Sequence, residues 1–264
     1  RLKRRSMRIL AITNQKGGVG KTTSAVNLSA ALAHLKQRVL LIDLDPQGNA
    51  TTGCGIVKTD ALPTVYQLLL GDTTLGNAIQ KTEFGFDILP ANRELAGAEI
   101  ELIELDGREQ KLKEALATVS DRYDYVLIDC PPALNMLTVN ALVASQSVMI
   151  PMQCEYYALE GLSDLVETLR KVRGNLNPDL EIEGLLRTMY NAQNTLTQQV
   201  SDELTSHFGD KVYNTIIPRN VRLAEAPSHG KPAMAYDASS KGAQAYAALA
   251  EELLGRHGKA VAAK

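Results

Sequence analysis

Short apolar runs rich in β-branched residues alternate along this chain with longer segments in which apolar residues recur every three or four positions. The short runs predict strands buried on both faces, and the longer segments predict amphipathic helices. The expected strands are the run that starts at Arg8, then Val39–Ile42, Tyr125–Ile128, Val148–Ile150 and Val212–Ile217, with Glu183–Met189 as a weaker candidate. The expected helices are Ser24–Leu35, Ala96–Leu105, Arg108–Val119, Thr138–Ala144, Leu159–Val172, Thr195–His207 and Lys241–Leu254.

This alternation indicates an α/β fold with a mostly parallel central sheet, helices on both faces and right-handed crossovers. The 264 residues are enough for one large domain, and neither a repeat nor a linker divides them. We therefore expect a single domain over residues 7–254. We interpret residues 1–6 as an extra N-terminal segment or a remnant of upstream sequence, and residues 255–264 as a flexible C-terminal tail.

Composition and charge restrict the function. Hydrophobic residues make up 45% and charged residues 22% of the chain, as in ordinary globular proteins. The formal net charge of −2 gives no overall preference for nucleic acid, so a site for it has to be a local basic surface. No apolar run reaches the length of a membrane span, and the residues after Leu254 lack the bulky apolar side chains of a membrane-binding helix. We expect a cytoplasmic protein without stable membrane association.

The cysteines and histidines show no metal-ligand spacing. Cys54, Cys130 and Cys154 are too few and too scattered for a disulfide framework, and they include no C-x-x-C pair. Cys130 is interpreted as a small buried residue rather than a nucleophile, because no histidine lies near it in the sequence. The four histidines are scattered as well, and we assign none of them a catalytic role.

The segment KGGVGKTT, residues 16–23, carries the most specific chemistry in the sequence. It lies between a predicted strand and a predicted helix, which is the order that a phosphate-binding loop requires. Because backbone N–H groups of such a loop converge on phosphate oxygens, we expect nucleotide binding by Gly17, Gly18, Val19, Gly20, Lys21, Thr22 and Thr23. Lys21 is expected to reach the β- and γ-phosphates, and the Thr22 hydroxyl is expected to hold Mg²⁺.

The loop departs from the usual pattern at one place. Where the usual loop has a glycine, five residues before Gly20, this chain has Gln15, and Lys16 follows it. A second lysine puts two cations beside one small anion site. This arrangement suits a polyphosphate and suggests a separate, catalytic role for Lys16.

Carboxylates follow two of the predicted strands. Asp43 and Asp45 come after the second strand and share a strand face by period two, and Asp129 ends the apolar run Val126–Ile128. Since the carboxyl ends of parallel strands line the ligand crevice, these side chains should lie near the loop. One of the first two can orient an attacking water while the other reaches the Mg²⁺ shell; we assign the water to Asp45. Asp129 is expected to hold Mg²⁺, with Asp45 also close to it.

Four blocks of the sequence resemble the ParA family of partition ATPases, the chromosomal Soj type in particular, within the deviant Walker A (MinD-like) group of P-loop ATPases. The blocks are K-G-G-V-G-K-T-T, D-L-D-P-Q-G-N-A-T-T-G, V-L-I-D-C-P-P and I-I-P-R-N-V-R-L-A-E-A-P-S-H-G-K-P, in the family's order. The resemblance extends from Met7 to about Leu254. It implies the P-loop NTPase fold of the deviant Walker A type.

The resemblance also implies a cycle of activity. Such proteins bind ATP and Mg²⁺ and form a homodimer with nucleotide at the interface, where Lys16 matches the signature lysine that contacts the partner's nucleotide. The ATP-bound dimer binds double-stranded DNA without sequence preference. A ParB-type centromere-binding protein stimulates the otherwise slow ATP hydrolysis and releases the dimer, which drives chromosome or plasmid segregation over the nucleoid.

Further site residues are carried over by the same resemblance. Asn191 and Pro218 correspond to positions near the adenine, and Arg222 matches an arginine that relatives use for DNA. At a second such position this chain has Gln193. The basic residues of the C-terminal third are predicted to bind DNA phosphates: Arg219, Arg222, Lys231 and Lys241.

Three other functions use a similar loop. A MinD-like ATPase would position another cargo at the membrane or the cell pole, and the weak C-terminal tail argues against it. A reductase of the nitrogenase iron-protein kind would need two cysteines per subunit around a cluster, and the cysteines here lie in other contexts. A metabolic kinase would need an acceptor pocket that the sequence does not identify.

Overall fold

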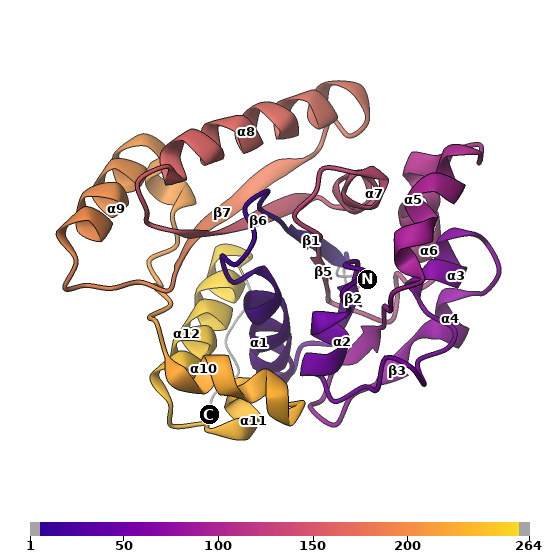
Figure 1. Ribbon diagram of the computed structural model, residues 1–264, viewed down its shortest axis with the longest axis horizontal. Coiled ribbons are helices and arrows are strands. Elements are labelled where there is room, and N and C mark those ends of the chain that lie inside the picture. The colour runs from indigo at the N-terminus through magenta and orange to yellow at the C-terminus, as the bar shows by residue number, and fades with distance from the viewer. Residues whose placement is uncertain (1–5, 259–264) are drawn as a thin grey trace.

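The computed structural model describes residues 6–258 of the chain. Its centre is a seven-stranded sheet with the order β3-β4-β2-β5-β1-β6-β7 (Figure 1). The strands are β1 (Arg8–Ile12), β2 (Val39–Asp43), β3 (Gln80–Lys81), β4 (Asp87–Leu89), β5 (Tyr125–Asp129), β6 (Ser147–Gln153) and β7 (Glu181–Thr188). All neighbouring strands are parallel except β3 and β4. The mostly parallel sheet that the alternation predicts is confirmed.

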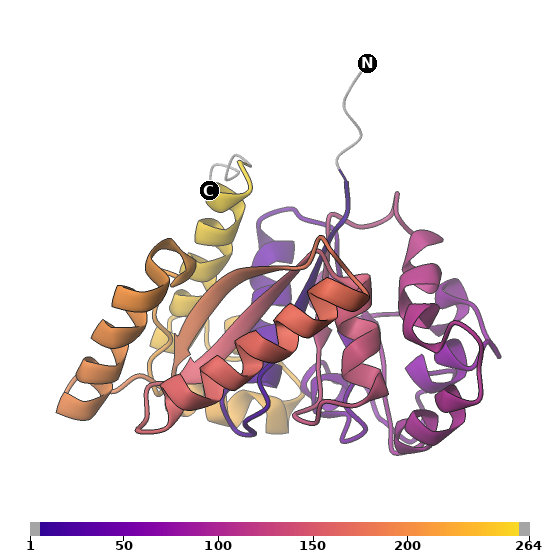
Figure 2. The ribbon, with the colours of Figure 1, turned by 90° about the horizontal axis from the view of Figure 1, so that it is seen from above.

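Helices cover both faces of this sheet (Figure 1). One face carries α1 (Lys21–His34), α2 (Asn49–Gly53), α10 (Val221–Glu225), α11 (Ala233–Tyr236) and α12 (Lys241–Arg256). The other carries α3 (Val65–Leu69), α4 (Leu75–Ala78), α5 (Leu95–Ile103), α6 (Lys111–Ala117), α7 (Met136–Ala144) and α8 (Ala158–Asn175), which lies across β6 and β7 (Figure 2). Helix α9 (Thr195–Phe208) lies beyond β7, and short 3₁₀ turns span Arg108–Gln110, Gly209–Lys211 and Ala226–His229.

The core consists of two apolar layers, one on each side of the sheet. Along β1, Ile9 and Ala11 pack on the side of α7 and α8, whereas Leu10 and Ile12 pack against α1 and α12. The central strands β2 and β5 are buried at every position. Burial on both faces explains why these strands read as continuous apolar runs instead of alternating with polar residues.

One of the expected strands needs correction. The predicted strand Val212–Ile217 is wrong: it follows the edge of β7 but forms a single bridge, from Val212 to Leu185. The reason is a competing partner, because the N–H groups of Asn214 and Thr215 donate to the Glu252 carboxylate on α12. The weaker candidate Glu183–Met189, in contrast, is the full-length strand β7. The short strands β3 and β4 were not predicted.

The ends of the described chain also differ from expectation. Helix α12 continues to Arg256, two residues beyond the predicted end, and His257 is held by Tyr125 (2.7 Å) and Glu183 (2.8 Å). Residues 255 and 256 thus belong to α12, and His257 is anchored by these two side chains. Residues 259–264 of the predicted tail, and residues 1–5 of the predicted N-terminal segment, lie outside the described residues. Within residues 6–258, no helix combines the length and apolar character needed to cross a membrane.

Candidate functional site

The site lies where three parallel strands end together. Ile12, the last residue of β1, is level with Asp129 at the end of β5, and Asp129 is level with Asp43 at the end of β2. The loop of residues 13–20 leaves β1 at this edge and leads into α1. Carboxylates, loop and helix N-terminus therefore meet at one end of the sheet, in the place where open α/β sheets bind ligands.

The loop has the backbone that its glycines allow. Gly18 and Gly20 have φ angles of 70° and 87°, in the left-handed region that side chains disfavour. The hydroxyl of Thr188, at the end of β7, donates to the carbonyl of Val19 (2.7 Å) and ties the loop to the sheet. Gly20 caps α1 without any side-chain hydrogen bond, so the first N–H groups of this helix are left for an anion.

Lys21 points into the loop. Its side chain is buried, and its ammonium donates to the carbonyl of Lys16 at 2.9 Å. Burial lowers the pKa of Lys21, and the negative charges of Asp129 and Asp45 act against this effect. A cation in such surroundings gains strongly from a phosphate, because it has few other partners and little water around it.

Thr22 and Asp129 form the part of the site that suits a hard cation. The Thr22 hydroxyl donates to Oδ2 of Asp129 at 2.7 Å, and Oδ1 of Asp129 is buried without a hydrogen-bond partner. Burial, and then the nearby Asp43 carboxylate, raises the pKa of Asp129 well above its usual range. A buried carboxylate oxygen without a partner, next to a hydroxyl, fits Mg²⁺, which prefers oxygen ligands and few protein groups. No cluster of three or more His, Cys, Asp or Glu ligands occurs in residues 6–258.

Asp43 and Asp45 have different surroundings. Asp43 is fully buried, and its carboxylate accepts from the Thr51 N–H (2.9 Å), the Thr51 hydroxyl (2.7 Å) and the Asp45 N–H (3.1 Å). Burial raises the pKa of Asp43 to about 6 in spite of these bonds. Asp43 therefore shapes the turn into α2, and the role at the metal shell that we considered for it is not supported. Asp45 is only half-buried and accepts from the N–H of Gln47 (2.9 Å).

A cavity of about 160 Å³ lies beside the loop. Among its lining residues are Gly20, Thr188, Met189, Pro218 and Tyr246. Met189 has a φ of 48°, an uncommon backbone for a residue with a side chain, at the point where β7 ends. Pro218 lines this cavity, and its contact with the adenine stays a prediction. Asn191 does not line this cavity; it lines a neighbouring one of about 260 Å³ together with Glu155 and Asn194.

The four basic residues expected to bind DNA are all exposed but not equivalent. Arg222 forms ion pairs with Glu225 (2.8 Å) and Asp237 (3.3 Å), so its charge is already compensated. Lys231 and Lys241 flank α11, in a group of packed helices with α10 and α12, and make no ion pair within the described residues. Arg219 lines the cavity beside the loop and also the neighbouring cavity of about 260 Å³.

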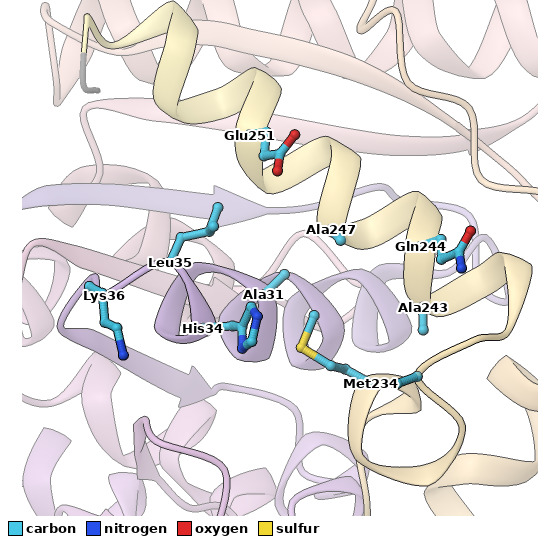
Figure 3. Close-up of a pocket in the computed structure, with 10 residues that line it drawn as sticks. Ala31, His34, Leu35, Lys36, Met234, Ala243, Gln244, Ala247 and Glu251 are labelled. Carbon is cyan, nitrogen blue, oxygen red and sulfur yellow. The ribbon is translucent and has the colours of Figure 1, made fainter. Parts of the chain in front are cut away.

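The remaining features lie outside the site. A cavity of about 440 Å³ between α1 and α12 is lined mainly by small or apolar side chains such as Ala31, Met234 and Ala247 (Figure 3). It contains none of the residues assigned to phosphate or metal binding.

The three cysteines are free and buried; burial raises the pKa of Cys130 and Cys54 and brings that of Cys154 to about 11. The buried position expected for Cys130 is confirmed.

Sequence reasoning missed several residues that the fold brings to the site. Thr188 comes from the weaker strand candidate, and Tyr246 comes from α12, where its hydroxyl lies 2.9 Å from the Ser24 hydroxyl. Glu155 follows β6 and pairs with Lys16. A polar residue near the end of a predicted parallel strand is the signal that could have found Thr188, since such positions line the crevice. Glu155 lies five residues after the predicted strand Val148–Ile150, so no such signal marks it in the sequence.

Comparisons with known proteins agree with this geometry. The AAA domain family matches residues 7–182. The chain is 57% identical to the sporulation initiation inhibitor protein Soj of Bacillus subtilis, covering 93% of this chain and 98% of that protein. It is 53% identical to the chromosome partitioning protein ParA of Caulobacter vibrioides, with 95% of each chain covered.

Solved structures show the same fold. The structure titled cobyrinic acid a,c-diamide synthase from Mycobacterium smegmatis, with bound ATP analog and magnesium, has a TM-score of 0.84 and 39% identity, with 96% of both chains covered. The septum site-determining protein MinD with Mg-ADP from Pyrococcus horikoshii has a TM-score of 0.78 and 29% identity, covering 96% of this chain and 98% of that one. Together with the loop and its carboxylates, these similarities show that the chain belongs to the ParA/Soj family of chromosome-partitioning P-loop ATPases.

Proposed function

We propose that this chromosome-partitioning ATPase is a nucleotide-controlled DNA switch. ATP occupies the loop of residues 17–23, with the base in the cavity at Met189 and Pro218 and Mg²⁺ held by Thr22 and Asp129. The bound ion would neutralise phosphate charge. Lys21 binds the phosphates, and Asp45 orients the attacking water. Asp45 is chosen over Asp43 because the Asp43 carboxylate already accepts from backbone and hydroxyl donors, whereas Asp45 accepts from the N–H of Gln47.

The observation that carries the proposal is the opposite placement of the two loop lysines. Lys21 is buried and points inward, whereas Lys16 is exposed and pairs with Glu155 at the outer rim of the site. A lysine at the rim can contact a nucleotide bound by a second subunit if it leaves Glu155. We therefore propose that ATP draws two copies together face to face, and that Lys16 contributes to catalysis across the interface.

The dimer then binds double-stranded DNA without sequence preference. Two copies of the basic residues Lys231 and Lys241, and of Arg222 once it exchanges Glu225 and Asp237 for phosphate, double the number of phosphates that can be neutralised. This suffices for weak and salt-sensitive binding. The described chain offers no obvious arginine finger, so hydrolysis is slow until a ParB-type partner completes the site and releases the dimer from the nucleoid. Chromosome or plasmid origins would move with this cycle.

A gel shift on duplex DNA of unrelated sequence tests the proposal. The chain is mixed with ATP, ADP or no nucleotide, at low and at moderate salt, with Lys21→Ala as the variant that cannot bind phosphate. We expect a shift with ATP alone that weakens as salt rises and is lost in the variant. The absence of binding in every state would instead favour a MinD-like ATPase with another cargo, which liposome flotation would then examine.

A further inference from the structure

The ion pair between Lys16 and Glu155 joins two segments that are distant in the sequence. Lys16 lies in the loop after β1 and Glu155 lies just after β6, the neighbouring strand in the sheet. Both side chains are about half exposed, at 56% and 43%. The backbone N–H of Lys16 also donates to the Asn14 side chain (3.0 Å), whose amide donates to the Pro151 carbonyl on β6 (2.9 Å). The loop is thus held toward the end of β6 by its backbone and by its lysine.

The surroundings of this pair suit contact with a second copy. Tyr156 and Tyr157 follow Glu155 directly, are 72% and 69% exposed, and pack edge to face with ring centroids 4.7 Å apart. Exposed tyrosines of this kind are the side chains that protein interfaces bury at their centres. A subunit that covers these rings would also cover the ion pair, which would then change from a solvated pair to a desolvated one.

We infer that Glu155 is a positioning residue that holds Lys16 within its own subunit and thereby sets the threshold for nucleotide-driven dimerisation. The inference rests on the proposed function. For Lys16 to contact the nucleotide of the other subunit, it has to leave Glu155, and two such pairs break in each dimer. The phosphates of ATP compensate Lys16 for the lost ion pair with Glu155. ADP, which lacks the γ-phosphate, compensates less.

The exchange needs a partner for the Glu155 carboxylate, because a buried carboxylate without one is costly. The cavity of about 260 Å³ that Glu155 lines supplies candidates, since Arg219, Asn191 and Asn194 line it too. Arg219 makes no ion pair within the described residues. The carboxylate can therefore exchange the ammonium of Lys16 for the guanidinium of Arg219 as the subunits meet.

Glu155→Gln is the direct test, because glutamine keeps the shape of the side chain and removes its charge. Dimerisation constants are measured by analytical ultracentrifugation with a non-hydrolysable ATP analogue and with ADP. A surface ion pair contributes about 0.2–1 kcal/mol, and the variant monomers no longer have these two pairs to break. Dimerisation should therefore tighten roughly twofold to thirtyfold with either nucleotide. ADP-bound protein should then dimerise at concentrations where the wild-type protein stays monomeric. Glu160→Gln, which removes a carboxylate from the start of α8, should change neither constant.

Double variants separate this role from a general effect of charge. In a Lys16→Ala background, Glu155→Gln should have no further effect, because there is no lysine to release. Arg219→Gln should weaken ATP-driven dimerisation, and do so less when residue 155 is glutamine. An unchanged constant in Glu155→Gln, or an equal gain without Lys16, overturns the inference while the proposed function stands. A wild-type protein that remains monomeric with ATP overturns both.

Discussion

The hydroxyl of Thr22 donates to Asp129 across 107 residues of sequence, at a distance of 2.7 Å. It joins the first turn of α1 to the end of β5 and leaves the second carboxylate oxygen of Asp129 buried without a donor. A hydroxyl and a carboxylate in this relation are the two protein groups that a magnesium ion needs beside the phosphates of a nucleotide. A nucleotide whose Mg²⁺ is held by Thr22 and Asp129 would therefore be connected directly to the end of β5.

Thr22→Val tests this link, since valine has nearly the same shape and no hydroxyl. We expect Mg²⁺-dependent ATP hydrolysis to fall about 10- to 100-fold, in the range seen when a group that supports a metal ligand is removed. The measurement is steady-state ATPase activity over a series of Mg²⁺ concentrations. Thr22→Ser keeps the hydroxyl and should retain most of the activity; equal losses in both variants would show that the hydroxyl is not the cause.

Asp45→Ala should keep ATP binding and lose turnover by about 10²- to 10⁴-fold, because the water would lack its general base. Without hydrolysis the ATP-bound dimer should accumulate. Quantitative nucleotide binding, single-turnover hydrolysis and size-exclusion chromatography with ATP measure these three effects. Asp60→Ala, which removes an exposed carboxylate after the same strand, serves as the control. A monomeric Asp45→Ala variant in the presence of ATP would contradict the role of Asp45.

The buried Asp43 predicts a pH-dependent stability. Burial raises its pKa from 3.8 to about 6, so the protonated form favours folding at low pH and this contribution disappears as the pH rises through about 6. The loss for Asp43 alone is on the order of 3 kcal/mol. Asparagine would place its NH2 group against an N–H from which the carboxylate now accepts, so Asp43→Asn should be less stable than the wild-type protein at low pH. Because asparagine does not titrate, this deficit should shrink as the pH rises from about 4 to about 7. Urea unfolding of both proteins over this range measures the difference, and Asp72→Asn should show no such trend.

Arg222→Ala should weaken DNA binding by the ATP-bound protein. Each phosphate contact contributes about 0.9 to the slope of log K against log salt concentration, so two copies per dimer should lower this slope by about 1.8. Arg170→Ala is a matched control, because Arg170 forms a similar exposed pair with Glu167 (3.0 Å) on α8. Fluorescence anisotropy with labelled duplex DNA at several salt concentrations measures both. An unchanged slope in Arg222→Ala would mean that Glu225 and Asp237 retain this arginine when DNA binds.

Gly184→Ala should destabilise the fold. A Cβ atom at residue 184 would lie 2.3 Å from the ring of Tyr213, which is fully buried beneath β7. Such overpacking costs about 1–3 kcal/mol. Gly174→Ala, in α8, meets no atom within 4 Å and should gain up to about 1 kcal/mol, because alanine favours a helix more than glycine does. Chemical unfolding measures both changes, and similar values for the two variants would contradict this account of Gly184.

Much of this protein follows from local sequence. The apolar runs of β1, β2 and β5 and the spacing of the helices predict the α/β fold, because burial on both faces leaves a pattern within each short segment. The order of strand, glycine turn and helix predicts the phosphate loop, and the acid at the end of β5 predicts Asp129. These signals depend on neighbours in the chain, which is why the sequence alone carries them.

Tertiary structure decided the rest, since it depends on which distant segments the crossovers bring together. The segment 212–217 has the composition of a strand, yet two of its N–H groups, those of Asn214 and Thr215, donate to the Glu252 carboxylate on α12. Asp43 and Asp45 look alike in sequence, but Thr51 donates hydrogen bonds only to the carboxylate of Asp43. Pro218 lines the cavity beside the loop and Asn191 does not, and Lys16 meets Glu155 beyond the end of another strand. Each of these contacts joins residues whose separation in the sequence gives no indication of their distance in space.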